Sequence, residues 1–420
     1  MPNTRHASWT APWVWLAAGL LLAGVPAVAP SAWAAPELAG PPLRIGVITD
    51  MSGQYSDGNG AGSVQAARFA VEDFGGTVLG RPIEVIYADH QNKPDIAAGI
   101  VRQWLDTGGV DVVVEGVNSA VGLAIQGVTR ERGKIFLISG AGSSDLTGKE
   151  CSPTSVHWTY DTYASATATA GAVMKLGGKR WFFLTADYAF GQALQRDASH
   201  AVEAGGGTVV GSVKHPFGAT DYSSYLIQAQ SSPADVVAFA DAGSDFANAA
   251  KQAVEFGLPA SGKTLAALQV TITDVPALGL QTVAGILFTE SWYWDLDDRT
   301  RAFGQRFFKV RNAMPTAYQA GVASAVGHYL RAVRDAGTVD AKAVMDTMRA
   351  TPVEDFFTPH GVIRADGRMV HDMYLMRFKK PEDSTGKWDL YHLEATIPGD
   401  QAFRPLAAGA CPYVNGAKAG

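Results

Sequence analysis

Strand-like runs and helical patterns alternate along this chain, and the alternation occurs twice. The first set has four strand patterns, at residues 43–49, 82–88, 111–115 and 134–139. Helical patterns lie between them, at residues 63–74, 95–105 and 119–132. Such alternation predicts a parallel sheet that is covered by helices on both faces.

The second set repeats this arrangement. Its strand patterns lie at residues 181–187, 208–213, 235–240, 265–269 and 285–289. Its helical patterns lie at residues 164–176, 191–204, 222–230 and 245–256. Two similar halves in tandem predict an α/β protein with two lobes, each built on its own sheet.

The chain then returns between the two lobes. Helical patterns at 301–311, 316–336 and 341–349 precede a strand-rich stretch with turns. We therefore predict a first lobe from residues 43–160 and 291–358, a second lobe from 161–290 and 359–395, and a C-terminal tail over 396–420. A cleft between two lobes is a preferred place for a ligand.

The N-terminus has the pattern of a signal peptide. Arg5 precedes an apolar run over residues 13–29, and small residues stand at the −3 and −1 positions of a cut after Ala34. The alternative is an uncleaved anchor helix, which two prolines at the end of the run and the lack of a charged stop disfavour. No later segment approaches the roughly 20 apolar residues that span a bilayer. We expect a product exported to the periplasm.

The chain has only two cysteines, Cys151 and Cys411. Two cysteines cannot build a four-Cys zinc site or a disulfide-rich scaffold. In an oxidising compartment the simplest expectation is one disulfide, which would tie the tail to the middle of the chain. Two free buried thiols are the alternative.

Charge and motifs exclude several classes of protein. With 34 Lys+Arg against 40 Asp+Glu, the net charge of −6 disfavours nucleic-acid binding. Residues 257–264 match the phosphate-binding pattern G-x-x-x-x-G-K-T, but there a helix leads in and a strand leads out, the reverse of a nucleotide loop. The histidines show no metal-binding spacing, and no G-x-S-x-G elbow occurs. We expect no enzyme, no cofactor and no metal.

Short polar loops follow three strands of the first set. They are Met51 to Tyr55, Gly116 to Ala120 with Asn118 and Ser119 in it, and Ser139 to Ser144. Backbone N–H groups and hydroxyls at the start of a helix suit a carboxylate. Each loop alone can be mere helix capping, but together at one sheet edge they favour a small-anion site.

These residues permit a comparison with a known family. The segments Arg44 to Gly53, Ala66 to Gly76, Ser143 to Thr147 and Asp187 to Gly191, in this order, carry the likeness. The chain resembles the periplasmic solute-binding proteins of the branched-chain amino-acid transporter family. The resemblance implies a type I fold: two Rossmann-like lobes, joined by three crossovers, close on a ligand that is delivered to an ABC permease.

The resemblance also implies roles for single residues. Tyr55 matches an aromatic residue over the ligand, and Tyr318 matches an aromatic wall. Ser119, Ala141, Gly142 and Ser143 match positions that bind an α-carboxylate through hydroxyl and N–H groups.

Two positions depart from the amino-acid binders. Phe190 stands where these usually have a Tyr, and Gln269 where they usually have an acid that pairs with the ammonium. A buried ammonium needs a counter-charge, which Asp241 is the candidate to supply. The departures favour an aromatic or hydrophobic organic acid as the ligand, with a branched-chain amino acid as the alternative.

Three further points stay open. Trp292, Tyr293 and Trp294, near an expected crossover, either line the cleft or pack the hinge. A ligand-sensing receptor module of the same fold is the alternative to transport. We expect a monomer.

Overall fold

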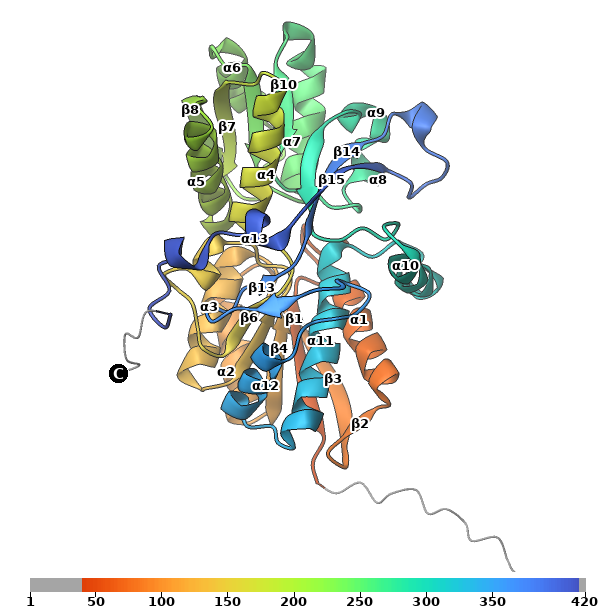
Figure 1. The fold of residues 1–420 in the computed structure, drawn as a ribbon. Helices are drawn as coiled ribbons and strands as arrows, with labels where there is room; N and C mark the ends of the chain where they lie inside the picture. The colour runs from red at the N-terminus through yellow and green to blue at the C-terminus, as the bar shows by residue number, and fades with distance from the viewer. Residues whose placement is uncertain (1–39, 415–420) are drawn as a thin grey trace, which may run out of the picture. The chain divides into compact units, whose positions relative to one another are not determined.

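The computed structural model of the chain describes residues 40–414, and the elements are shown in Figure 1. The predicted leader and its cleavage after Ala34 lie outside these residues. No helix between residues 40 and 414 combines the length and the apolar character that a membrane-spanning segment requires.

The first lobe is built on a six-stranded sheet in the order β2-β3-β1-β4-β5-β6. Its strands are β1 (Leu43–Thr49), β2 (Thr77–Val78), β3 (Arg81–Asp89), β4 (Val110–Glu115), β5 (Ile135–Ile138) and β6 (Ser155–His157). Only β2 runs antiparallel to its neighbour. The parallel sheet predicted from the first set is therefore confirmed, and the short strands β2 and β6 were not predicted.

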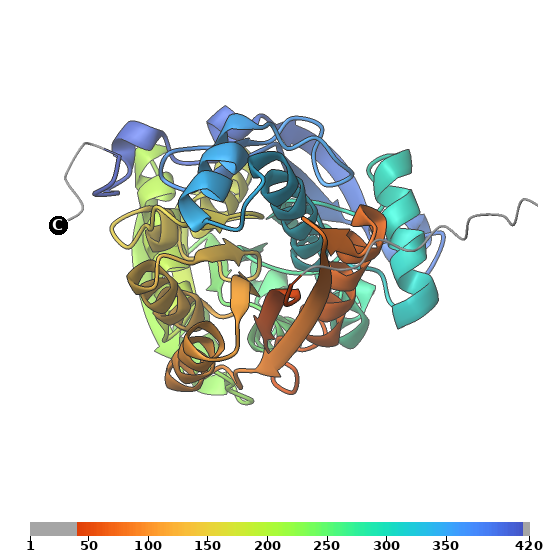
Figure 2. The same cartoon turned by 90° about the horizontal axis from the view of Figure 1, so that it is seen from below.

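Helices cover both faces of this sheet. Successive buried residues of β1 point to opposite sides, so that Val47 packs with α1 (Gly60–Phe74) and α11 (Ala317–Ala336), whereas Ile48 packs with α2 (Pro94–Asp106) and α3 (Ser119–Glu131). Runs that are apolar on both faces are what a covered parallel sheet requires. Figure 2 shows the helices on the two sides of the first sheet.

The second lobe has a four-stranded parallel sheet in the order β10-β9-β7-β8. Its strands are β7 (Arg180–Ala186), β8 (Thr208–His215), β9 (Val236–Ala240) and β10 (Thr264–Ala267). The helices are α4 (Thr162–Lys175), α5 (Ala189–Ala204), α6 (Ser223–Ser231) and α7 (Ser244–Glu255). One apolar cluster joins the sheet to α4 and α5, and another joins it to α6 and α7.

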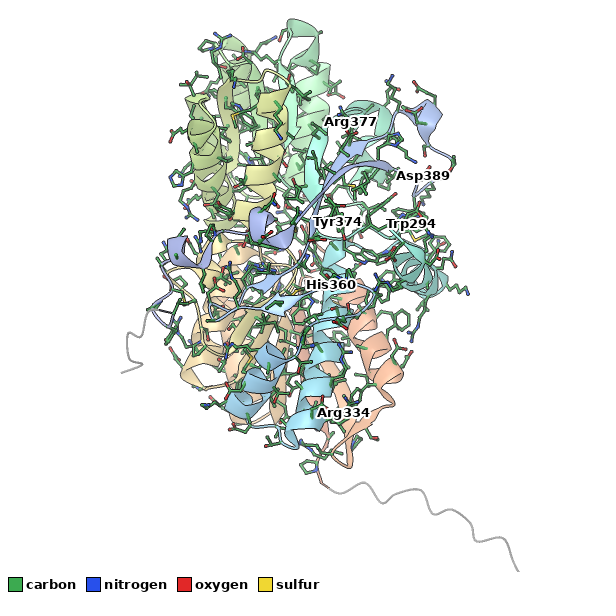
Figure 3. The ribbon with its side chains drawn as sticks, in the orientation of Figure 1. Trp294, Arg334, His360, Tyr374, Arg377 and Asp389 are labelled. Atoms are coloured by element: carbon green, nitrogen blue, oxygen red, sulfur yellow. A yellow bond between two sulfur atoms is a disulfide. The ribbon has the colours of Figure 1, made fainter. Side chains whose placement is uncertain are left out.

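The strand expected at 285–289 does not join this parallel sheet. It forms β11 (Leu287–Glu290), which pairs antiparallel with β14 (Met373–Phe378), and β14 pairs with β15 (Tyr391–Ile397). Figure 3 labels Arg377 on β14. Its guanidinium contacts Glu394 of β15 at 2.7 Å. Alternating strand patterns do not reveal the partner of a strand, and the partner here comes from far along the chain.

Three crossovers connect the lobes. The chain passes from β6 to α4, returns after β11 to α10 (Asp298–Arg311), α11 and α12 (Ala341–Ala350), and passes back into β14. The short pair β12 (Val362–Ile363) and β13 (Met369–Val370) packs on the core of the first lobe. These contacts favour a change of lobe between residues 371 and 373, rather than after residue 358 as the sequence predicts.

The chain ends with a segment that returns to the first lobe. After α13 (Gly399–Ala402), the Arg404 guanidinium donates to the Ser144 carbonyl at 3.1 Å. Cys411 then forms a disulfide with Cys151 across a sequence separation of 260 residues. The predicted disulfide is confirmed. Figure 1 shows this last segment beside the lower lobe.

Candidate functional site

A cavity lies between the two lobes. Its free volume is about 430 Å³, including the part open to solvent. The first lobe lines it with loops that follow β1, β4 and β5, including Tyr55, Asn59, Asn118, Ser119 and Gly142. The second lobe adds Tyr188, Phe190, Thr271 and Asp274, and Tyr160 and Tyr318 complete the wall.

The loop after β1 is shaped by the side chain that ends the strand. The Asp50 carboxylate accepts the backbone N–H groups of Gly53 at 2.7 Å and of Tyr55 at 3.0 Å. From the other side, the Thr316 hydroxyl donates to the Gly58 carbonyl at 2.6 Å. Since Thr316 caps α11, a strand end and a helix start together hold Tyr55 at the cavity.

Tyr55 contacts the second lobe directly. Its hydroxyl lies 2.5 Å from the Tyr188 hydroxyl. Beside this pair, the Ser244 hydroxyl donates to the Gln54 side-chain carbonyl at 3.0 Å. Burial raises the pKa of Tyr55 and of Tyr188, so both hydroxyls keep their protons. These contacts give a closed arrangement of the lobes over the cavity.

The start of α3 forms the wall on the first lobe. Asn118 has a φ of 75°, which Asn adopts more readily than most residues. Its side-chain oxygen accepts the N–H groups of Ala120 at 3.0 Å and Val121 at 3.4 Å, and so caps the helix. The positive end of the helix dipole therefore lies at the cavity and favours negative charge there.

Two of the N–H groups expected to bind a carboxylate, those of Gly142 and Ser143, already form hydrogen bonds within the protein. The Ser119 oxygen accepts the N–H of Gly142 at 3.2 Å and the N–H of Ser143 at 3.0 Å. Because that oxygen accepts both bonds, the hydroxyl proton of Ser119 is free to point toward a ligand. Of the expected donors, the Ser119 hydroxyl is therefore available, whereas the N–H groups of Gly142 and Ser143 are used.

Two of the predicted carboxylate-binding residues lie behind the wall, which in the described chain includes neither of them. The Ala141 carbonyl accepts from the His157 ring at 2.7 Å. The Ser143 hydroxyl accepts the N–H of Asp145 at 3.3 Å and caps a short 3₁₀ turn. Both residues support the loop after β5.

Two other predicted site residues, Phe190 and Tyr318, line the cavity. Gln269 lies behind Tyr318: its amide donates to the Tyr318 hydroxyl at 2.7 Å, and its carbonyl accepts from Ser165 at 3.1 Å. Gln269 therefore orients Tyr318.

Asp241 is buried at the end of β9 and is not among the described residues that line the cavity. Its carboxylate lies 3.4 Å from Nε2 of His215. Burial raises the pKa of Asp241 to about 6, against the opposing effect of His215. Because Asp241 pairs with His215 and does not line the cavity among the described residues, the structure does not support it as the counter-charge for a ligand.

Asp274 lines the cavity and was not predicted from the sequence. One carboxylate oxygen of Asp274 accepts the Thr271 N–H at 2.7 Å and the Thr271 hydroxyl at 2.9 Å. Burial raises its pKa to about 6. In the sequence, Asp274 stands before Val275 and Pro276, which indicates only a helix start. The cavity lining therefore holds one carboxylate, and it is a different residue from the predicted candidate Asp241.

The charge of the cavity follows from its lining. Of the described residues around it, Asp274 is the one carboxylate, and none is Lys, Arg or His. The rest are aromatic rings, amides, hydroxyls and small residues. The wall offers the Ser119 hydroxyl at the start of α3 on the first lobe and one acid on the second.

The nucleotide-loop pattern is a turn, as predicted. Helix α7 ends at Glu255, a 3₁₀ turn follows at Pro259–Ser261, and β10 begins at Thr264. The Lys263 ammonium donates to the carbonyls of Ser232 at 2.9 Å and Ala234 at 3.0 Å. Lys263 therefore has a structural role.

The aromatic triplet packs the hinge. Trp292 donates its ring N–H to the Phe356 carbonyl at 3.2 Å, and Trp294 donates to the Trp388 carbonyl at 3.0 Å. Figure 3 shows Trp294 close to Asp389, which lies in the segment between β14 and β15. Within residues 40–414, no group of three or more His, Cys, Asp or Glu side chains could hold a metal ion.

Comparison with known proteins gives a consistent family. Residues 42–387 match the sequence profile of a family described as periplasmic binding protein. A periplasmic binding protein of known structure from Burkholderia mallei is 49% identical, over 89% of this chain and 99% of that chain, with a TM-score of 0.88.

Two other relatives carry more specific descriptions. One is a branched chain amino acid ABC transporter periplasmic ligand-binding protein from Burkholderia xenovorans LB400, with 40% identity, coverage of 88% and 99%, and a TM-score of 0.80. The other is Leu/Ile/Val-binding protein homolog 6 of Brucella melitensis, with 24% identity over 82% of this chain and 89% of that protein.

Proposed function

This chain belongs to the periplasmic binding protein family, the solute-binding components of ABC importers, and we propose that its cavity takes a small amino acid-like zwitterion. The family consists of binding proteins rather than enzymes, as the sequence predicts. The single observation that carries the ligand class is Asp274, an acid on the second lobe in a cavity whose described lining has no basic side chain.

The carboxylate of this ligand binds at the start of α3. The Ser119 hydroxyl, which accepts two backbone N–H groups, donates to it, and the helix dipole favours its charge. The ammonium pairs with Asp274. A buried ammonium without such a partner would be strongly unfavourable.

The side chain of the ligand lies among aromatic rings. Tyr55, Tyr188 and Phe190 come from both lobes, and the rings of Tyr160 and Tyr318 lie tilted to each other at a centroid distance of 5.2 Å. Such a wall suits a branched or aromatic side chain.

The aromatic wall also favours a second candidate, an aromatic or hydrophobic organic acid. That ligand would use the same donors at α3 but would bring its charge close to Asp274. The two negative charges would repel each other, and an organic acid is therefore the second candidate.

Ligand binding then closes the lobes and favours delivery to an ABC permease. Because both walls of the cavity come from one chain, we propose that the monomer is the functional unit. We also propose that the protein is exported to the periplasm and that its leader is removed after Ala34. The alternative role, a ligand-sensing receptor module, would use the same closure.

Titration calorimetry of the mature protein tests the ligand class. We expect heat of binding with Leu, Ile, Val or Phe and little or none with benzoate-type and keto acids. Binding of these acids without any binding of the four amino acids would contradict the proposal and support the second candidate.

A further inference from the structure

Glu115 is an unusual residue at the end of β4. It is fully buried, and its φ of 88° lies in a region that residues other than glycine rarely adopt. Such a backbone is unfavourable and persists where the surrounding structure requires it. Glu115 precedes the loop with Asn118 and Ser119, yet it is absent from the cavity wall among the described residues.

The polar atoms around Glu115 lack partners. Among the described residues, both carboxylate oxygens of Glu115, the side-chain oxygen of Asn59 and the Ser63 hydroxyl are buried without a hydrogen bond. A Cβ added at Gly140 would lie 2.5 Å from a Glu115 oxygen and 2.8 Å from the Asn59 oxygen. Both oxygens therefore border Gly140.

The protonation of Glu115 decides whether these atoms can pair. An ionised carboxylate would set three acceptor oxygens against one donor, the Ser63 hydroxyl. A protonated carboxyl supplies the missing donor, and all the groups can then be paired. Leaving buried acceptors unpaired is costly.

We propose that Glu115 is a neutral carboxylic acid that donates its proton to the Asn59 side-chain oxygen and accepts from the Ser63 hydroxyl, and so positions the Tyr55 loop. The Asn59 amide donates in turn to the Tyr55 carbonyl at 3.3 Å. Glu115 is thus linked to Tyr55 through one residue. The role of Tyr55 at the ligand rests on the proposed function, whereas the protonation of Glu115 does not.

The electrostatics of the site agree with this assignment. Burial raises the pKa of Glu115 to about 8, against the opposing effect of Ser63. The pairing residues on both neighbouring strands, Ile48 and Ile138, are apolar. Tyr160 is the titratable side chain that interacts with Glu115, and burial keeps its own pKa high.

The variant Glu115→Gln tests the proposal without any ligand, because an amide donates and accepts as a neutral acid does. A carboxyl that binds its proton more tightly when folded stabilises the protein at low pH and loses this effect as pH rises. We expect the melting temperature of Glu115→Gln, relative to wild type, to rise between about pH 5 and about pH 8 and then to level off. Glu203→Gln, on the exposed side of α5, is the control and should show no such trend.

Two further measurements complete the test. The infrared carboxyl C=O stretch of a protonated acid should be present in wild type at neutral pH and should lose intensity in Glu115→Gln. Hydrogen exchange across residues 53–63 should be roughly tenfold faster in Glu115→Ala, as for one lost hydrogen bond, and unchanged in Glu115→Gln.

A pH-independent difference in melting temperature, or no change in the carboxyl band, would overturn the proposal that Glu115 is a neutral acid. Equal exchange in the Ala and Gln variants would overturn the positioning of the Tyr55 loop. Failure of Glu115→Gln to fold would also count against the proposal, since Gln reproduces its hydrogen bonds. None of these outcomes depends on which ligand binds.

Discussion

The Tyr55 hydroxyl of the first lobe lies 2.5 Å from the Tyr188 hydroxyl of the second lobe. Both side chains line the cavity, so the bond joins the lobes at the rim of the proposed ligand site. Contacts that exist only in the closed form raise ligand affinity, because they shift the equilibrium toward closure. The pair therefore couples closure to binding without requiring contact with the ligand.

Tyr55→Phe and Tyr188→Phe should each weaken ligand binding. One lost hydrogen bond corresponds to about 0.5–1.5 kcal/mol, or roughly a 2- to 12-fold rise in Kd. Calorimetry with an amino acid that binds wild type measures this. The double variant should be no worse than either single one, since the bond is shared. Tyr87→Phe, on an exposed side chain, is the control; an equal loss there would contradict the role of the pair.

Asp274→Asn should distinguish the two ligand classes. If the ligand carries an ammonium, loss of the carboxylate should raise its Kd at least ~10-fold, as expected for a hydrogen bond to a charged group. If the ligand is an organic acid, the same change should lower its Kd, because a repulsion is removed. Asp400→Asn, an exposed acid in α13, is the control and should change little.

The pH dependence of binding provides an independent check on Asp274. Its pKa is raised to about 6 by burial, so the side chain loses its charge as pH falls through that value. Affinity for an amino acid should fall in this range in wild type and stay level in Asp274→Asn. Affinity that rises on acidification would favour the organic acid.

The sequence predicts the alternating framework because local patterns determine it. The strand at 43–49 and its covering helices are read from apolar spacing alone, and Asp50 and Asn118 stand where strands end. Asp274 escaped prediction because its place at the cavity depends on how the second lobe packs. The antiparallel pairing of β11 was not predicted for a similar reason. Its partner β14 lies far along the chain, and no local pattern encodes that pairing.

Lys263→Ala should leave any phosphate release unchanged and close to zero, since the residue is part of a turn. Its ammonium donates to two carbonyls, so the variant should lose about 1 kcal/mol of unfolding free energy. Urea denaturation and a phosphate assay with ATP measure the two effects. Phosphate release in wild type that disappears in the variant would contradict this reading of residues 257–264.

Removal of the disulfide should lower stability more than ligand affinity. The Cys151–Cys411 bond closes a separation of 260 residues, and the loss of a native disulfide typically costs about 2–5 kcal/mol. The double variant Cys151→Ser with Cys411→Ser should therefore unfold at lower denaturant concentration than the wild type. Since neither cysteine lines the cavity in the described part of the chain, its Kd should change less than threefold (~0.6 kcal/mol). The control is wild type with a reductant, which should approach the variant, whereas the variant should not respond. A large loss of affinity at unchanged stability would contradict this role and show instead that the tail governs closure.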